Sequence, residues 1–410
     1  MTSKLGLIAA WNGVRRLCST YSVALADETI TVKKTADDSQ PLSLPLRWLR
    51  DHCACDACYS QFTRQRLTDF AKLRDVSTLS SFAIVQRSAD DAAASQLELR
   101  WRDGHRSTFA LTELCQHGEQ NSPTLVPVEP WTGDDLQSRD RSVEYADLME
   151  GDDRGRQEGM RGFLERFLKY GVVEVRGTPR DDDEKASRRL CRAVSDVQRT
   201  VFGDFWTFRS GDYAYADTAY ATIPLGAHTD GTYYEHTPGI QVFHCLRPSN
   251  SGGETVLVDG EHVLRQLRAS SPESVELLCR HSVTHVYRDN DHFLSCSRPV
   301  LQLLDDGVGL RQLRFNPYDR AAVSAREASA CKGERLGAFY DAYSRLSRLV
   351  GEPASQCVTR LEPGTVLFLN NWRVMHGRTA IRGDAQRVFF GVYLQIEPVW
   401  SKARMLGLIP

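Results

Sequence analysis

The chain has 410 residues, a formal net charge of −2, 41% hydrophobic residues and 25% charged residues. These values are ordinary for a globular protein of two or three domains, and they lack the basic excess that binding to nucleic acid or an anionic membrane requires. No apolar run approaches the roughly 20 residues of a membrane span. We therefore expect neither nucleic acid nor membrane as a partner.

Residues 1–22 have the composition of a targeting segment. They contain Lys4, Arg15 and Arg16 and several Ser and Thr, the first acidic residue is Asp27, and apolar residues recur at helical spacing. An amphipathic, basic, acid-free segment is typical of a mitochondrial transit peptide. We expect delivery to the mitochondrial matrix, with a frayed terminus as the alternative.

Residues 23–130 are predicted to form a small N-terminal domain of short strands and turns. Leu97–Trp101 alternates like a strand and runs into the turn Asp103–His105, and the prolines between 123 and 130 indicate a connection to the rest of the chain.

A cluster of three cysteines lies in this domain. Eleven cysteines are an odd number, and Cys53, Cys55 and Cys58 are too close together for a usual disulfide framework. A tetrahedral structural zinc site needs one more ligand. His105 is the best candidate, because His52 directly precedes Cys53 and is poorly placed. The alternative is three buried thiols.

Residues 131–410 are predicted to form the second domain. The stretch 133–155 is charged and poorly periodic, so we expect it to be exposed. Apolar spacing predicts helices near 163–168, 183–201, 261–268 and 334–349, and strands at 172–175, 240–244, 255–258, 365–369 and 387–395. Short strands with a few outer helices favour a mainly β domain, a double-sheet jelly roll.

The motif His228-Thr229-Asp230, together with His376, is the strongest chemical signal in this domain. Alternation along a strand would place His228 and Asp230 on one face, and His376 would come from another strand of the same barrel. Two histidines and one carboxylate on one face of a metal are the ligands of non-haem Fe(II) oxygenases. A surface turn is the alternative for an isolated His-x-Asp.

Arg387 strengthens this interpretation, because it stands eleven residues after His376. A fixed guanidinium can grip the distal carboxylate of a keto-acid cosubstrate in a bidentate manner.

Several motifs carry a family resemblance. The chain from about Leu42 to its end resembles the γ-butyrobetaine/trimethyllysine dioxygenase family, the 2-oxoglutarate oxygenases of carnitine biosynthesis. The motifs are His228–Asp230, Gly239–Leu246, Gly252–Gly253, Leu257–Gly260 and Asn371–Arg378.

The resemblance implies a double-stranded β-helix catalytic domain with a small zinc-bearing N-terminal domain, and it implies a homodimer. Arg387 would bind 2-oxoglutarate, and His105 would be the fourth zinc ligand. The implied cofactors are Fe(II), 2-oxoglutarate, O2, ascorbate and structural zinc. The implied reaction couples decarboxylation of 2-oxoglutarate, giving succinate and carbon dioxide, to hydroxylation of a substrate C–H bond.

Aromatic residues around the metal motif suggest a quaternary ammonium substrate, because such a cation has no N–H and is recognised by ring faces. Trp206 and Tyr220 resemble the family's positions that surround trimethylammonium, and Phe202 stands where the butyrobetaine enzymes have tyrosine. Tyr234 is a further candidate, although aromatic clusters are more often core.

Asp217 bears on the choice of substrate. It stands where the butyrobetaine enzymes place an asparagine near the substrate carboxylate, so its charge would repel butyrobetaine and attract an α-ammonium. The alternative is a turn aspartate. Asn316 would help to hold an amino-acid carboxylate, and the segments 217–220, 315–321 and 403–408 also resemble the trimethyllysine branch of the family.

We therefore expect hydroxylation of Nε-trimethyllysine at C3, with γ-butyrobetaine hydroxylation as the nearest alternative. A non-catalytic, zinc-bearing protein that binds methylated lysine is the alternative of another class. The intact set His228, Asp230, His376 and Arg387 argues against it.

Overall fold

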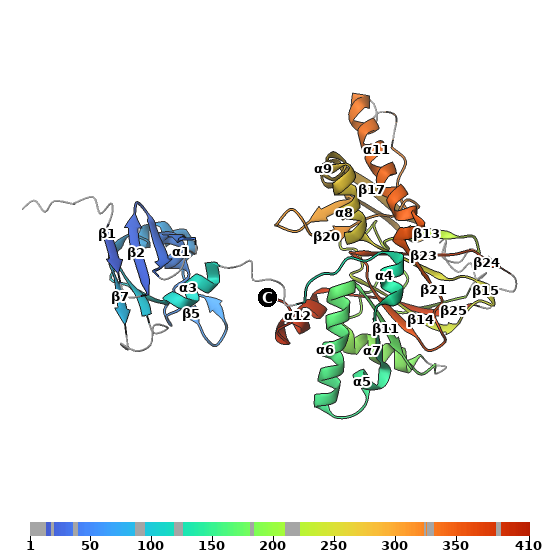
Figure 1. Ribbon diagram of the computed structural model, residues 1–410, viewed down its shortest axis with the longest axis horizontal. Coiled ribbons are helices and arrows are strands. Elements are labelled where there is room, and N and C mark those ends of the chain that lie inside the picture. The colour runs from blue at the N-terminus through green and yellow to red at the C-terminus, as the bar shows by residue number, and fades with distance from the viewer. Residues whose placement is uncertain are drawn as a thin grey trace, which may run out of the picture. The chain divides into compact units, whose positions relative to one another are not determined.

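A computed structural model of the chain describes residues 14–17, 20–35, 40–86, 95–118, 126–180, 184–209, 222–323, 325, 332–382 and 387–410. The chain divides into two compact units, Met1–Ser122 and Pro123–Pro410 (Figure 1). The predicted connection 123–130 groups with the second unit, where the Val126 amide donates to the Leu408 carbonyl (3.2 Å) and the Glu129 amide donates to the Lys169 carbonyl (2.9 Å).

The first unit contains two antiparallel sheets of three or more strands, one two-stranded antiparallel ribbon and short helices. One sheet has the order β1-β2-β3-β4 and the other β7-β8-β9. Apolar side chains from both sheets form one core, including Val23, Ile30, Leu97 and Leu99, each essentially inaccessible. The elements are β1 (Val14–Leu17), β2 (Tyr21–Ala26), β3 (Thr29–Lys34), β4 (Leu42–Pro45), α1 (Leu46–Asp51), β5 (Tyr59–Ser60), β6 (Gln65–Arg66), η1 (Phe70–Lys72), α2 (Leu73–Val76), β7 (Leu79–Gln86), β8 (Ser95–Trp101), β9 (Arg106–Ala110) and α3 (Leu111–Gly118).

The end predicted for the targeting segment, residue 22, falls inside β2. Tyr21 and Ser22 are both buried, and β2 pairs with β1 on one side and β3 on the other. A cleavage that keeps this strand whole would have to precede Tyr21.

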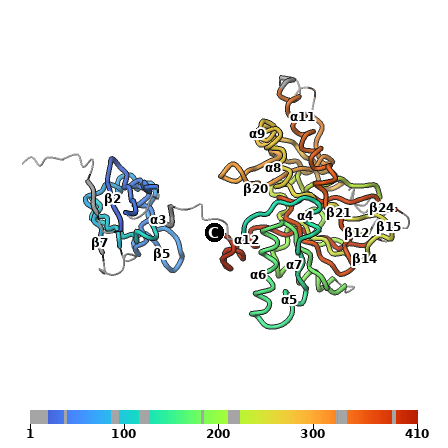
Figure 2. Tube along the Cα trace, viewed as in Figure 1, coloured from blue at the N-terminus to red at the C-terminus, as the bar shows by residue number. Residues whose placement is uncertain are grey.

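The second unit is built on two larger sheets. One has the order β10-β11-β22-β14-β25-β12, and the other β13-β23-β16-β21. In the first sheet β14 pairs with β25, so the middle of the chain lies beside its end, as the trace in Figure 2 shows. The strands are β10 (Ser142–Glu144), β11 (Val172–Arg176), β12 (Trp206–Arg209), β13 (Leu225–His228), β14 (Ile240–Arg247), β16 (Thr255–Asp259), β21 (Gln356–Thr359), β22 (Val366–Asn370), β23 (Val374–Arg378) and β25 (Val388–Leu394).

Helices cover the outer faces of both sheets. Phe163 and Phe167 of α6 pack with Val242 and Phe390 of the six-stranded sheet. On the other side, α8, α9 and α11 pack with Met375 of β23, so the two helical groups lie on opposite sides of the sheets in Figure 1. The helices are α4 (Gly133–Ser138), α5 (Tyr145–Met149), α6 (Asp153–Tyr170), α7 (Lys185–Val194), α8 (Gly260–Ser270), α9 (Pro272–Arg280), α11 (Lys332–Gly351), η4 (Pro353–Ser355) and α12 (Glu397–Met405).

Three small ribbons complete the second unit. They pair β15 (Ser251–Gly252) with β24 (Ile381–Arg382), β17 (Ser282–Arg288) with β18 (Phe293–Pro299), and β19 (Leu301–Leu303) with β20 (Leu310–Leu313). The prediction of a mostly sheet domain with outer helices is therefore confirmed.

Two predictions about single elements were wrong. The stretch 133–155 is not exposed throughout, because it forms α4 and α5 and buries Leu136, Tyr145 and Leu148. Helices of five or six residues are too short to show a periodic stripe. The helix predicted over 183–201 ends at Val194, because Val197 instead forms a bridge with Leu394 of β25.

Helix α6 shows how local sequence positions these layers. The Asp152 carboxylate accepts a hydrogen bond from the Gly155 amide (2.8 Å) at its start, and Gly171 (φ 72°) ends it in the left-handed region. The fully buried strand Val172–Val175 follows at once.

Among the residues that the structure describes, none of the helices combines the length and the apolar character that a membrane span requires.

Candidate active site

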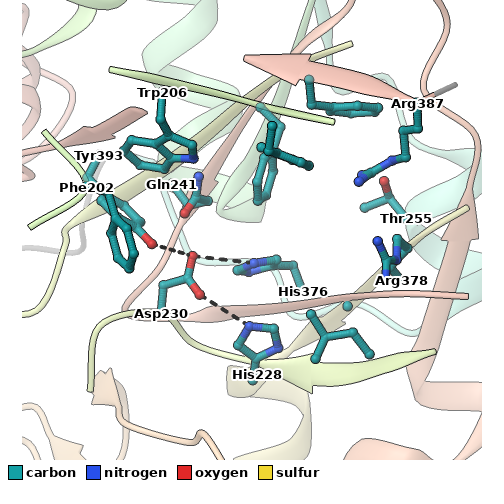
Figure 3. Close-up of a pocket in the computed structure, with 15 residues that line it drawn as sticks. Phe202, Trp206, His228, Asp230, Gln241, Thr255, His376, Arg378, Arg387 and Tyr393 are labelled. Atoms are coloured by element: carbon teal, nitrogen blue, oxygen red, sulfur yellow. Dashed lines mark hydrogen bonds and ion pairs between the residues drawn. The ribbon is translucent and has the colours of Figure 1, made fainter. Parts of the chain in front are cut away.

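A pocket lies between the inner faces of the two large sheets. The four-stranded sheet contributes His228, Thr255, His376 and Arg378, and β12, β14 and β25 contribute mostly aromatic residues (Figure 3). The lining residues are Phe202, Trp206, Phe208, Leu225, His228, Asp230, Gln241, Phe243, Thr255, His376, Gly377, Arg378, Arg387, Phe389 and Tyr393.

His228, Asp230 and His376 meet in this pocket. His228 and His376 are directly paired across β13 and β23. The two carboxylate oxygens of Asp230 lie 3.2 Å from His228 Nε2 and 3.6 Å from His376 Nε2. One donor atom from each residue lies within 4.8 Å of the others, which is close enough for one metal ion.

Asp230 reaches this position by a turn. The prediction that His228 and Asp230 share a strand was wrong, because β13 ends at His228. The Asp230 amide donates to Asn371 Oδ1 (2.8 Å), and Asn371 Nδ2 donates back to the Asp230 carbonyl (3.1 Å). Gly231 continues the turn with φ 67°, and a Cβ there would stand 2.5 Å from Pro238 Cδ.

The protonation states of His376 and Asp230 suit metal binding. His228 Nδ1 lies 2.9 Å from the Gly226 carbonyl oxygen, and donation there leaves Nε2 facing Asp230. Burial lowers the pKa of His376 to about 4, although Asp230 opposes this shift, so the imidazole is neutral at physiological pH. Burial would raise the pKa of Asp230, but His376, His228 and the Tyr393 hydroxyl outweigh it and lower the value to about 2. A neutral imidazole and a carboxylate are the forms that ligate Fe(II).

Arg387 and Arg378 line the other end of the pocket, beside Thr255 (Figure 3). Burial lowers the pKa of Arg387 to about 9, so the side chain still carries a positive charge at neutral pH. Its guanidinium carbon lies 3.9 Å from the centre of the Phe389 ring, and within the described ranges its Nε has no hydrogen-bond partner. A buried cation of this kind is suited to a carboxylate ligand.

Aromatic side chains form the opposite wall. The rings of Trp206 and Tyr393 are 4.7 Å apart, and Phe202 lies 6.1 Å from Trp206. The Tyr393 hydroxyl also donates to Asp230 Oδ2 (3.0 Å), which connects this wall to the metal ligands. The candidate substrate residues Asp217 and Tyr220 lie outside the described residues.

Two other candidate substrate residues, Tyr234 and Asn316, are not among the residues that line the pocket. The Tyr234 hydroxyl accepts the Val201 amide (3.0 Å), next to Phe202. The Asn316 amide donates to Asp319 (2.8 Å), and its oxygen accepts the Tyr318 amide (3.0 Å). In this structure both residues brace the surrounding loops.

Three residues that line the pocket are not indicated by the sequence. Gln241, Tyr393 and Arg378 carry no diagnostic spacing to the metal motif, although each lies in or beside a motif of the family resemblance or a predicted strand. Asn371 lies in the motif Asn371–Arg378, but its contact with the Asp230 turn depends on tertiary structure.

In the first unit, the thiols of Cys53, Cys55 and Cys58 lie 3.3, 3.7 and 3.6 Å from His105 Nε2. These four donor atoms form the second cluster with metal-ligand geometry among the described residues. Arg50 Nη1 donates to the Cys58 thiol (3.2 Å); burial would raise the pKa of this thiol, but hydrogen bonds led by Arg50 lower it. His52 points elsewhere, because its Nδ1 contacts the Trp48 carbonyl.

Comparisons with known proteins agree with this geometry. The sequence model of the taurine catabolism dioxygenase TauD, TfdA family matches residues 129–393, and that of the γ-butyrobetaine hydroxylase-like N-terminal domain matches residues 25–115. The chain is 33% identical to mitochondrial trimethyllysine dioxygenase of Bos taurus, over 88% of this chain and 82% of that protein. It is 30% identical to trimethyllysine dioxygenase of Meyerozyma guilliermondii, over 88% of this chain and 90% of that protein.

A solved structure of asparagine oxygenase with Fe(II), 2S,3S-3-hydroxyasparagine and succinate aligns with a TM-score of 0.44. The sequence identity is 17%, over 62% of this chain and 93% of that one.

Proposed function

This chain belongs to the taurine catabolism dioxygenase TauD, TfdA family and, within it, to the trimethyllysine dioxygenases, and on that premise we propose that it hydroxylates Nε-trimethyllysine at C3. It is a 2-oxoglutarate-dependent oxygenase. The proposed reaction converts 2-oxoglutarate and O2 to succinate and carbon dioxide and inserts one oxygen atom into the substrate C–H bond.

The order of groups along the pocket carries this proposal. A buried arginine, Arg387, lies at one end, the set His228, Asp230 and His376 lies in the middle, and an aromatic wall lies at the other end (Figure 3). A dianionic keto acid and a cationic substrate can thus approach the metal ligands from opposite ends without competing for the same charges.

At the cosubstrate end, Arg387 would hold the distal carboxylate of 2-oxoglutarate, and the three metal ligands would hold Fe(II). When bound, the iron with 2-oxoglutarate and O2 supplies the oxidising chemistry. The chain contributes orientation: Asn371 fixes the turn that carries Asp230, and Tyr393 hydrogen-bonds its carboxylate.

At the substrate end, Trp206, Phe202 and Tyr393 would face the trimethylammonium group. Each ring face contributes up to about 2 kcal/mol when the cation is desolvated. From the sequence, Tyr220 would complete this wall and Asp217 would attract the α-ammonium. The contribution of Asn316 would be indirect, through the loop that it braces, and that of Tyr234 would be through the Phe202 segment.

The direct test is turnover. Purified protein is incubated with Fe(II), ascorbate and 2-oxoglutarate and with trimethyllysine, γ-butyrobetaine or lysine, and succinate and hydroxylated product are quantified. We expect product with trimethyllysine, one succinate per hydroxylation, and complete loss in His376→Ala. Preference for γ-butyrobetaine would contradict the substrate assignment. Absence of any substrate-dependent succinate would favour the non-catalytic alternative.

The charge at position 217 has its own test. Asp217→Asn removes the proposed partner of the α-ammonium, so the ratio of kcat/KM for trimethyllysine over γ-butyrobetaine should fall by about tenfold. A ratio that stays unchanged would rule out a role for this charge in selectivity.

We also propose structural zinc at Cys53, Cys55, Cys58 and His105, ascorbate as the reductant that sustains turnover, and a homodimer. Mitochondrial delivery, with the matrix as the destination, is supported by the basic, acid-free N-terminus and by the mitochondrial naming of the bovine relative. Imaging of the full chain fused to a fluorescent protein, with and without residues 1–20, tests the targeting.

A further inference from the structure

Trp206, the central ring of the aromatic wall, rests on a residue that has no side chain. In the register of β12 and β25, Trp206 is the direct partner of Gly391. A Cβ on Gly391 would stand 2.5 Å from Trp206 Nε1, 2.6 Å from Cε2 and 3.0 Å from Cζ2. Those distances are far below van der Waals contact, so the indole occupies the space that any other residue at 391 would fill.

Space, and not backbone conformation, requires this glycine. Eleven glycines of the described chain have positive φ, and Gly391 is not one of them. The strand around it is also fixed in place: Phe390 and Val392 point to the opposite face and are completely buried against the helical layer. The clash between a side chain at 391 and the indole therefore could not be relieved by an outward shift of β25. The indole itself would have to move.

The glycine also borders the path toward the metal ligands. On its other side, Gly391 pairs with Phe243 of β14, and the Phe243 ring lies 5.2 Å from the His376 ring. Trp206, Gly391 and Phe243 thus form one row across three strands, which leads from the aromatic wall to a metal-ligating histidine. The Trp206 indole fills the space above Gly391 in this row.

We propose that Gly391 is a positioning residue that determines substrate specificity, because its missing side chain seats Trp206 and sets the distance between the cation-binding wall and the metal. This inference rests on the proposed function. When Trp206 holds the quaternary ammonium, that distance fixes how many carbons separate the ammonium from the carbon that reacts. Moving the indole by the width of a methyl group changes both the affinity for the cation and the carbon that is presented.

The test compares Gly391→Ala with the wild-type enzyme under saturating Fe(II) and 2-oxoglutarate. We expect the KM for trimethyllysine to rise by about tenfold or more, since one ring face is lost. Succinate should form in excess over hydroxylated product, because the C–H bond is misplaced. The Kd for 2-oxoglutarate should stay within about twofold, since Arg387 lies at the other end of the pocket.

Gly337→Ala is the matched control, because Gly337 is exposed on α11 and a Cβ there meets no atom within 4 Å. This variant should retain wild-type KM and coupling. A Gly391→Ala enzyme that behaves like Gly337→Ala would overturn the inference.

A double-variant cycle tests whether Gly391 acts through the indole. In a Trp206→Phe background, the ring lacks the pyrrole atoms closest to the added Cβ, so Gly391→Ala should change the KM by less than about threefold. An undiminished effect in that background would overturn the inference. If Gly391→Ala alone does not fold, the double variant should be soluble; an insoluble double variant would show that the glycine is needed for another reason.

Failure of the proposed function would look different. A wild-type enzyme that makes no product from trimethyllysine would contradict the substrate assignment and leave Gly391 to be judged by binding. Anaerobic calorimetric titration of wild type and Gly391→Ala with trimethyllysine and with γ-butyrobetaine measures that binding directly. Equal affinity of the two proteins for the cation that the wild type binds would overturn the role of Gly391.

Discussion

Gln241 is a buried amide among the mostly aromatic residues that β12, β14 and β25 contribute to the pocket. It lies on β14 opposite Tyr393 of β25 and is completely buried. Its Nε2 donates to the Val242 carbonyl (3.0 Å), but among the described residues its Oε1 has no partner. Burying an unpaired carbonyl costs roughly 1–3 kcal/mol, so this oxygen is expected to meet a donor or a positive charge on the bound ligand.

We predict that Gln241→Met weakens substrate binding without lowering the thermal stability of the protein. The thioether has a similar volume and removes the unpaired oxygen, so the melting temperature should stay the same or rise. The KM for trimethyllysine should rise several-fold, about 1 kcal/mol of lost interaction. Steady-state assays and calorimetry measure the two effects. A lower melting temperature with an unchanged KM would show that Gln241 is a structural residue.

At the scale of elements, close approach of β13 to β23 brings the two histidines together. Gly377, next to His376, permits this approach: a Cβ at 377 would stand 2.5 Å from the Leu225 carbonyl oxygen and 2.9 Å from the Ala227 nitrogen. Backbone atoms cannot move aside as a flexible side chain can. The distance between His228 and His376 therefore depends on the absence of a side chain at 377.

Gly377→Ala should accordingly weaken iron binding by about tenfold or more, the loss typical of disturbed support around a metal ligand. Equilibrium dialysis with ferrous iron under argon measures the affinity, and Gly337→Ala again provides the control. Iron affinity equal to that of the control would mean that the strands tolerate the extra methyl group.

A buried ion pair joins the elements behind the site. Arg373 donates to both oxygens of Asp259 (2.8 and 2.9 Å), and it also donates to the carbonyls of Lys169 and Glu129 (2.9 and 3.0 Å). It thereby connects the end of α6, the segment before α4 and the start of α8. Asp259 is almost inaccessible, so it cannot be solvated if its partner is removed.

Arg373→Met should lower the free energy of unfolding of the second unit by about 3–5 kcal/mol, because it leaves a buried carboxylate without a counter-charge. Urea denaturation followed by tryptophan fluorescence measures the change. Arg280→Met is the matched control: it removes an exposed pair with Glu276 (3.5 Å) and should cost less than about 0.5 kcal/mol. Equal effects of the two variants would contradict the assignment of the buried pair.

At the scale of the whole molecule, we expect each of the two units to bind its own metal and, of the two metals, to depend on that one alone for its stability. The first unit has a small core and the four converging donor atoms that we propose bind zinc, whereas the residues that we propose bind iron, His228, Asp230 and His376, lie in the second unit. In a small domain, metal-binding free energy contributes directly to folding.

Cys58→Ser should remove about one zinc ion per chain and lower the unfolding temperature of the first unit only. Metal analysis and differential scanning calorimetry measure the zinc content and the separate transitions, and Cys115→Ser, outside the ligand set, is the control. Full zinc retention in Cys58→Ser would contradict the ligand assignment, and iron loss would contradict the separation of the two metals.

Sequence alone determined the features that depend on spacing and composition. These features follow from local periodicity and from the residue types that bind metals and carboxylates. They are the apolar stripe of α6, the buried strands β11 and β14, the cysteine cluster, and the set His228, Asp230, His376 and Arg387. The metal set and the family resemblance together led to an iron- and 2-oxoglutarate-dependent oxygenase.

Only the tertiary structure decided what depends on strand register and on close approach. Asp230 lies in a turn held by Asn371, Gly391 leaves space for Trp206, and Gln241 faces the pocket from β14. The short helices α4 and α5 were also missed. The physical reason is common to Asp230, Gly391 and Gln241: each depends on contacts between segments far apart in the chain, and the spacing of residues along the sequence does not reveal which strands pair with each other.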